Sequence, residues 1–101
     1  MPGSLNNRAS ADAYSAANTL EVAPPASKVN MVIANAAVYV QFSDAAANST
    51  MRQTQSWLPE IFYLPGYYNL NRPTGPNRAV NGVRFRSAVA GTPAQVTVSA
   101  I

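Results

Sequence analysis

The chain has 101 residues, 48% of them hydrophobic, which is enough for one small domain with a single core. Because it contains no cysteine and no histidine, a thiol nucleophile, a disulfide framework, an imidazole base and a zinc site of the usual kind are excluded. Only 11% of the residues are charged, and the net charge is +3 with no run of lysine or arginine. This balance argues against a nucleic-acid partner and leaves a surface weakly protected against association.

The N-terminal segment differs from the rest of the chain. Residues 1–18 hold one leucine and one tyrosine among small and polar residues, so they cannot bury enough surface to order by themselves. We interpret them as an extended N-terminal arm that contributes to association, and residues 19–101 as one domain.

A strand pattern begins directly after this arm. Leu20 and Val22 share one face of a short strand that ends at Pro24, because proline cannot donate to a sheet. Alternation resumes over residues 31–42, where the residues at every second position, which share one face of a strand (one parity), are apolar and are predicted to be buried. That parity comprises Val32, Ala34, Ala36, Val38, Val40 and Phe42. Twelve residues is long for one strand, so we expect a bulge or break near Asn35.

Aromatic and aliphatic residues fall on both parities of residues 57–70, so this segment is either buried on two sides or meets another chain. Within it, Leu64-Pro65-Gly66-Tyr67 has proline and glycine where a type II turn needs them, which predicts a reversal between two short strands. We interpret its aromatic residues as the bulk of the core or an intersubunit patch, ahead of a site that stacks on sugar rings. They are Trp57, Phe62, Tyr63, Tyr67 and Tyr68.

The clearest alternation lies in the last third of the chain. Residues 83–87 alternate apolar residues with arginine, and residues 96–100 alternate valine or alanine with threonine or serine. A loop at residues 90–93 would join them as a hairpin that pairs Phe85 with Val98. In this register both arginines face outward. Short strands separated by proline and glycine turns, without a strong helix, predict a small antiparallel β-sandwich, with a small barrel as the alternative.

Four arginines are candidates for binding an anionic partner. Arg84 and Arg86 stand on one strand face, and Arg72 and Arg78 lie on the loop before that strand. Together they could hold phosphates, an acidic glycan or a carboxylate-rich protein surface, unless they are simply the solvated face of the sheet. A single-stranded nucleic-acid platform would also need aromatic residues between the arginines, and Phe85 points the other way.

The candidate partner-binding residues are therefore Trp57, Tyr63, Tyr67, Tyr68, Arg72, Arg78, Arg84 and Arg86. No catalytic residues, metal ligands or cofactors are expected, because only four well-separated carboxylates are available as general acids or bases. No apolar run approaches the roughly 18 residues of a membrane span, so no membrane partner is expected.

The stretch from Asn81 to Ile101, together with Val38–Phe42 and Leu64–Gly66, resembles small β-rich structural proteins of tailed bacteriophage particles. The likeness covers residues 30–101 and consists of a strand, a Leu-Pro-Gly turn, a Val-Arg-x-Arg-Ala strand, a short loop and a Val-Thr-Val end. The resemblance implies a non-enzymatic virion component in many copies, in contact with the major capsid protein or other virion proteins. Such a component is a capsid cement or decoration protein, or a small head–tail or tail protein.

A low-charge surface, a polar arm and an absence of catalytic groups are also what a repeating structural subunit needs. The alternative, of a different class, is a carbohydrate-binding or adhesion module of a phage tail, which would take a glycan as its partner. An accessory domain of an enzyme comes third. The tyrosines discriminate between the first two, since a sugar site requires them to be exposed in the isolated chain.

Overall fold

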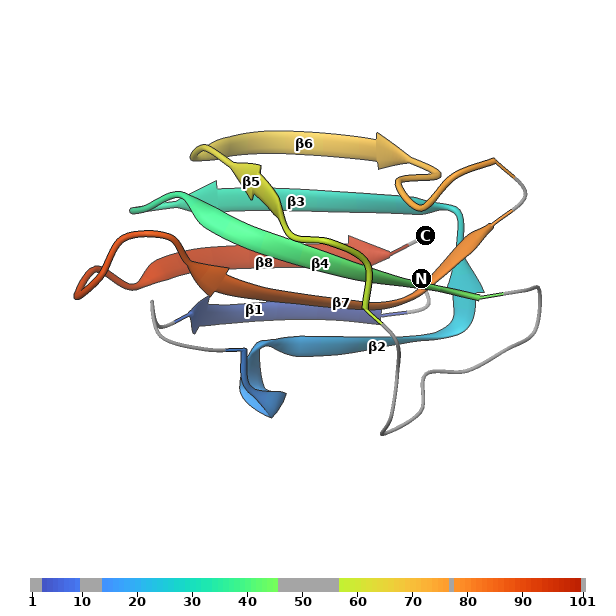
Figure 1. Ribbon diagram of the computed structural model, residues 1–101, viewed down its shortest axis with the longest axis horizontal. Helices are drawn as coiled ribbons and strands as arrows, with labels where there is room; N and C mark the ends of the chain where they lie inside the picture. Colours follow the sequence, from blue (N-terminus) through green and yellow to red (C-terminus); the bar gives the residue numbers. More distant parts are fainter. Residues whose placement is uncertain (1–2, 10–13, 46–56, 77, 101) are drawn as a thin grey trace.

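The computed structural model describes residues 3–9, 14–45, 57–76 and 78–100, which form eight strands and a short 3-10 helix (Figure 1). The elements in chain order are β1 (Gly3–Ala9), η1 (Ala16–Asn18), β2 (Thr19–Ala26), β3 (Lys28–Ala34), β4 (Val38–Ala45), β5 (Ile61–Tyr63), β6 (Gly66–Asn71), β7 (Ala79–Ser87) and β8 (Ala94–Ala100). Among the described residues, no helix has the length and apolar character needed to cross a membrane.

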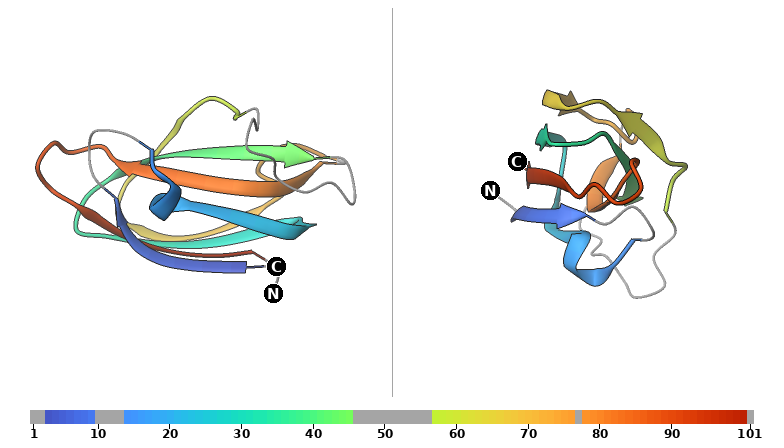
Figure 2. Two further views of the ribbon diagram at one scale, coloured as in Figure 1. Left: turned by 90° about the horizontal axis from the view of Figure 1, so that it is seen from below. Right: turned by 90° about the vertical axis from the view of Figure 1, so that its left-hand side faces the viewer.

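The strands form two four-stranded antiparallel sheets, which pack face to face (Figure 2). One sheet has the order β1-β8-β3-β6 and the other has the order β2-β7-β4-β5. Each sheet is open and has two edge strands. The predicted antiparallel sandwich is therefore confirmed, and the barrel alternative is wrong.

The strand pairing follows one rule: β1 pairs with β8, β2 with β7, β3 with β6 and β4 with β5. The chain thus doubles back on itself as a long antiparallel ribbon, and this ribbon is wound so that its strands fall alternately in the two sheets. Eight strands arranged in this way form a jelly roll. Six connections consequently cross between the sheets, and only the connection from β4 to β5 stays within one.

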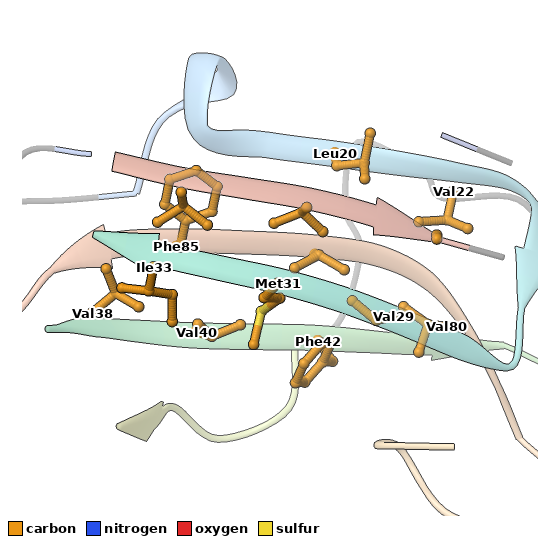
Figure 3. Packing of buried hydrophobic residues seen from close by; sticks show 14 of the residues in the cluster. Leu20, Val22, Val29, Met31, Ile33, Val38, Val40, Phe42, Val80 and Phe85 are labelled. Carbon is orange, nitrogen blue, oxygen red and sulfur yellow. The ribbon is translucent and has the colours of Figure 1, made fainter. Parts of the chain in front are cut away.

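The inner faces of the two sheets supply one core (Figure 3). Phe42 of β4 and Phe85 of β7 are its largest fully buried side chains. The burial parity predicted for residues 83–87 and 96–100 is confirmed on both strands. The buried apolar residues are Leu20, Val22, Ala26, Val29, Met31, Ile33, Ala36, Val38, Val40, Phe42, Val80, Val83, Phe85, Ala94, Val96, Val98 and Ala100.

The hairpin predicted between residues 83–87 and 96–100 is wrong. β7 pairs with β2 and β4, and β8 pairs with β1 and β3, so Phe85 lies opposite Val40 while Val98 lies opposite Met31. Alternation predicted which side chains are buried, but a sandwich buries the inward faces of both sheets. Parity alone therefore cannot distinguish a hairpin from a connection that crosses the core.

The crossing loop between β7 and β8 is held by a buried hydroxyl. The Ser87 hydroxyl donates to the carbonyl of Thr92 at 2.6 Å, and the amide of Val89 donates to Ser87 Oγ at 3.2 Å. The amide of Ala88 donates to the carbonyl of Ala37 at 2.8 Å, which ties this loop to the β3–β4 connection. Backbone groups near this loop are thus satisfied within the loop and by the β3–β4 connection.

The break expected near Asn35 is confirmed, since this residue has a positive φ of 75° between β3 and β4. The break also switches the buried parity. Val38 and its alternate neighbours are buried as predicted, but in β3 it is Met31 and Ile33 that are buried, whereas Val32 is exposed. The prediction of a buried Val32 and Ala34 is wrong because the chain changes sheets here, and the inward side changes with it.

The Leu64–Tyr67 segment does reverse the chain between two short strands, but these strands belong to different sheets. Gly66 has φ 157°, which is close to extended, whereas the third residue of a type II turn needs about +80°. The predicted type II turn is therefore wrong. The Tyr68 hydroxyl donates to the carbonyl of Leu64 at 2.7 Å and fixes the segment.

Part of the segment interpreted as an arm lies within the sandwich. Residues 3–9 form the edge strand β1, which pairs with β8 along its whole length. Tyr14 and η1 follow, and Asn18 is buried at the entry to β2. A contribution of residues 1–18 to association stays a prediction.

The strand order can be tested by cross-linking, because the chain has no cysteine of its own. Val32 and Thr97 are outward-facing neighbours in one sheet, within the separation that a disulfide spans. Arg84 and Ser99, which the hairpin would pair, lie in opposite sheets about 10 Å apart. We expect V32C/T97C to oxidise to an intramolecular disulfide, measured by mass spectrometry of proteolytic fragments, and R84C/S99C to remain reduced. Oxidation of the second pair alone would contradict this topology.

The shared core can be tested by truncation. Phe85→Ala removes a fully buried ring and should lower the free energy of unfolding by about 3–5 kcal/mol. Val89→Ala, on the exposed β7–β8 loop, should lower it by less than about 1 kcal/mol. Urea denaturation measures both, and equal losses would place Phe85 outside the core.

Candidate partner-binding surface

The outer face of the β2-β7-β4-β5 sheet carries a row of alternating aromatic rings and guanidinium groups, which we call the stacked cluster. The Cζ atom of Arg84 lies 4.4 Å from the ring centres of both Trp57 and Tyr14. The Cζ atom of Arg86 lies 5.8 Å from the Tyr14 ring and 4.4 Å from the Tyr39 ring. Contacts of this kind between cations and aromatic faces are attractive, the more so when they are partly shielded from water.

Strand register places these side chains. Arg84 and Arg86 are two residues apart on β7 and therefore share its outer face. Tyr39 of β4 lies opposite Arg86, and Phe62 of β5 lies opposite Tyr39 with its ring centre 5.5 Å away. Tyr14 reaches the same face from the segment before η1. The stacked cluster thus joins parts of the chain that are far apart in sequence.

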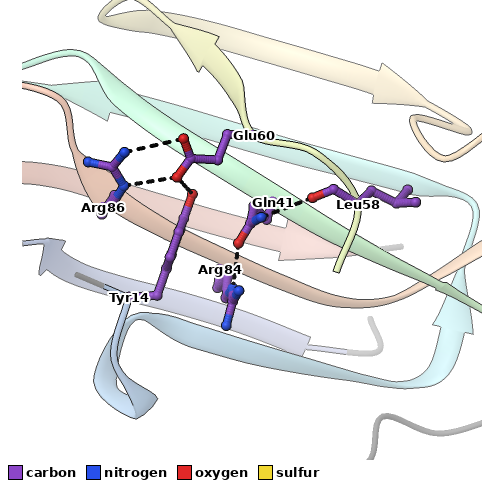
Figure 4. Close-up of polar contacts among 6 residues, drawn as sticks. All are labelled: Tyr14, Gln41, Leu58, Glu60, Arg84 and Arg86. Carbon is purple, nitrogen blue, oxygen red and sulfur yellow. Dashed lines mark hydrogen bonds and ion pairs between the residues drawn. The ribbon is translucent and has the colours of Figure 1, made fainter. Parts of the chain in front are cut away.

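Arg86 has a carboxylate partner inside the protein (Figure 4). Its Nε donates to Glu60 Oε1 at 3.0 Å and its Nη2 donates to Glu60 Oε2 at 3.2 Å. The Tyr14 hydroxyl donates to the same Oε1 at 2.8 Å. A two-point arginine–carboxylate pair is both strong and directional. Glu60 therefore fixes the N-terminal segment and β7 to the segment that leads into β5.

Arg84 is held by an amide instead of a carboxylate. Its Nε donates to Gln41 Oε1 at 2.8 Å, and Gln41 Nε2 donates to the carbonyl of Leu58 at 3.0 Å (Figure 4). The Leu58 amide in turn donates to the carbonyl of Phe42 at 2.9 Å, which continues the pairing beyond β5. This chain of hydrogen bonds fixes the position of Arg84 without neutralising its charge.

The titration behaviour of the stacked cluster follows from these contacts. Hydrogen bonds from Arg86 and Tyr14 lower the pKa of Glu60, and the bond to Glu60 raises the pKa of Arg86. Burial, followed by the hydrogen bond to Glu60, raises the pKa of Tyr14. Burial lowers the pKa of Arg84, which has no comparable bond to a carboxylate. The two arginines stand on one strand, but Arg86 has a carboxylate partner and Arg84 does not. Their pKa values are therefore shifted in opposite directions.

The structure brings together three of the residues predicted from sequence, Trp57, Arg84 and Arg86. Tyr14 and Tyr39 were missed. The argument that Phe85 points away from the arginines is correct for β7, but the aromatic neighbours come from other segments. Tyr39 could have been found by its outward parity in the stretch of residues 31–42. For Tyr14 no sequence signal beyond its isolation in a polar segment was available.

Arg72 and Arg78 are exposed on the β6–β7 connection and are not part of this site. Arg78 precedes Arg84 by six residues, about 20 Å of extended strand. Arg78 therefore does not lie beside Arg84, and a joint role of the four arginines stays a prediction.

The aromatic residues of residues 57–70 do not make the core. Tyr63 and Tyr68 are partly buried against it and meet edge to face with ring centres 4.8 Å apart, whereas Phe62 and Tyr67 are exposed. Their interpretation as the bulk of the core is wrong, because β5 and β6 are edge strands and valine fills the interior.

Exposed apolar side chains instead gather around the β5 and β6 edge of the sandwich, from both sheets and from the turn between them. We call this surface the apolar edge. Its members, with their exposed fractions, are Val32 (46%), Ile61 (40%), Phe62 (51%), Leu64 (61%) and Tyr67 (66%).

Comparison with protein-family models, with curated proteins and with solved structures finds no match to this chain. The resemblance to phage structural proteins therefore stays a prediction. Among the described residues, no group of three or more acidic, histidine or cysteine side chains is placed to hold a metal ion.

The contacts of Glu60 predict a pH dependence of stability. A carboxyl whose pKa is lower in the folded protein stabilises the fold at neutral pH, and this stabilisation is lost as the pH falls from the ordinary value of 4.5 through the folded value. We expect Glu60→Gln to be less stable than wild type at pH 7 and to approach it at pH 3, measured by urea denaturation. Glu21→Gln, on the exposed face of β2, is the control. Parallel pH profiles for wild type and Glu60→Gln would contradict the assigned role.

Proposed function

We propose that this protein is a non-enzymatic structural subunit of a virus particle, a capsid cement or decoration protein that acts through protein–protein contacts. The observation that carries the proposal is the apolar edge. Five large apolar side chains, each at least 40% exposed, are concentrated on one edge of a small sandwich. Large apolar side chains that stay exposed together around one edge of a small domain mark an interaction site.

The composition of this edge supports an interface with protein. Residues 61–71 contain no charged side chain and are rich in tyrosine, leucine and asparagine. Depletion of charge and enrichment in aromatic residues distinguish the centres of protein interfaces from the remaining surface. Edge strands that stay unpaired are usually protected by lysine, internal proline or a bulge, and β6 has none of these. The edge therefore suits a surface that is covered in an assembly.

The fold is consistent with this role but does not decide it. Jelly rolls build viral capsids and also lectins, and one fold can host unrelated functions. The absence of cysteine and histidine and the scarcity of carboxylates favour a binding role over catalysis. The resemblance of residues 30–101 to virion proteins favours the particle over other assemblies.

A second candidate function, carbohydrate binding, is favoured by the surroundings of Tyr67. Its side chain is 66% exposed on the outer face of the β1-β8-β3-β6 sheet. Asn69 follows on the same face, opposite Asn30, whose Oδ1 has no hydrogen-bond partner in the described structure. An aromatic face beside amide groups can stack on a sugar ring and bind its hydroxyls.

Binding to particle shells tests the proposal. The chain is added to shells of the particle encoded by the same genome and assembled without it. We expect saturable binding, weakened at least about tenfold by L64S/Y67S, since interface anchors contribute more than about 1.4 kcal/mol. Val89→Ser is the matched control, because Val89 is a comparably exposed apolar residue outside the apolar edge. Failure of wild type to bind, or equal weakening by the control, would contradict the proposal.

A glycan array separates the second candidate. Sugar stacking requires Tyr67 alone, so a carbohydrate-binding module should lose its signal with Tyr67→Ser and keep it with Leu64→Ser. A structural subunit should give no glycan signal and should bind shells more weakly with either substitution.

A further inference from the structure

We propose that Arg84 is the receptor for a carboxylate of a partner protein, which binds at the two Nη atoms of the guanidinium group. The inference rests on the proposed function in one respect, that the partner is a protein. It names the chemistry of that contact, an aspartate or glutamate side chain or a chain-terminal carboxylate.

The first argument is the unused hydrogen-bonding capacity of Arg84. A guanidinium has five N–H groups, and the one on Nε donates to Gln41. In the part of the chain that the structure describes, neither Nη of Arg84 meets an acceptor. The rings of Tyr14 and Trp57 attract the positive charge but accept no strong hydrogen bond. The Nη hydrogens of Arg84 are therefore donors held in place without a protein acceptor among the described residues.

The second argument is the local charge. Among the described residues, the stacked cluster has two guanidinium groups and one neighbouring carboxylate, Glu60, which is bound at two points by Arg86 and again by Tyr14. One positive charge is left over on a partly buried group. An incoming carboxylate would neutralise it, and the partial exclusion of water would strengthen the contact.

The third argument is the internal comparison with Arg86. Both side chains stand on the same strand face and both lie against Tyr14. For Arg86, Glu60 supplies the carboxylate that a guanidinium fork prefers. For Arg84, the side chains at the corresponding place are Gln41 and Trp57. The protein thus orients Arg84 but does not supply a carboxylate partner for it among the described residues. A carboxylate of a partner protein that binds there would give the contact direction and specificity.

The experiment uses the full chain and two acetylated peptides, hexaglutamate and hexaglutamine. The side-chain Nε–H signals of the arginines and the Trp57 indole N–H signal are followed by NMR during titration. We expect hexaglutamate to shift the Arg84 and Trp57 signals with saturation, weakening in 0.5 M salt, and hexaglutamine to shift neither. Shifts centred on another arginine would overturn the proposal.

Three variants separate a built site from general attraction. Arg84→Gln should lose the interaction, and Arg84→Lys should weaken it at least fivefold because lysine keeps the charge but not the fork. Arg72→Gln removes the same charge from the exposed β6–β7 connection and should bind as wild type does. Equal loss in Arg72→Gln and Arg84→Gln, or full binding by Arg84→Lys in a chain with a native spectrum, would overturn the proposal.

The same variants keep this inference distinct from the proposed function. If shells bind wild type and Arg84→Gln equally well, the carboxylate contact is wrong and the structural role stands. If hexaglutamate binds at Arg84 but shells do not bind wild type, the structural role is wrong and the carboxylate site stands.

Discussion

Burial of both inward sheet faces around Phe42 and Phe85 is the constraint on which the rest of this molecule depends. Six of the connections cross between sheets, so neither sheet can form from strands that are consecutive in the sequence. The ribbon is stable only when the two layers close on one core, within which Ser43 and Asn81 satisfy each other by a hydrogen bond of 2.6 Å. Because this core consumes the inward side chains, the outer faces and edges are free to carry binding groups.

The sequence predicts burial well where a strand keeps its sheet and fails where the chain crosses. Parity over residues 38–42 and 83–87 is correct, since each lies within one strand. Parity at Val32 is wrong because the crossing at Asn35 exchanges the inward side. The predicted β7–β8 hairpin fails for a related reason, because two apolar faces are equally well buried against each other across the core.

For the candidate surface too, the sequence predicted local features but not the long-range neighbours. That Arg84 and Arg86 share a face follows from their spacing and was predicted. Which ring or carboxylate meets each arginine depends on how the ribbon is wound, and this brings Tyr14 to β7 from the other end of the chain. The difference between the two arginines is set by these long-range neighbours. In the proposed assembly, the apolar edge would supply contact area and Arg84 would supply direction.

We propose above all that this jelly roll is a component of a particle in which its β5 and β6 edge is covered. The most direct measurement is electron cryomicroscopy of the particle encoded by the same genome, together with mass spectrometry of its proteins. We predict a fixed number of copies per particle and density in which another protein chain covers Leu64 and Tyr67. Absence of the chain from purified particles, or a bound copy whose β5 and β6 edge faces solvent, would contradict the account.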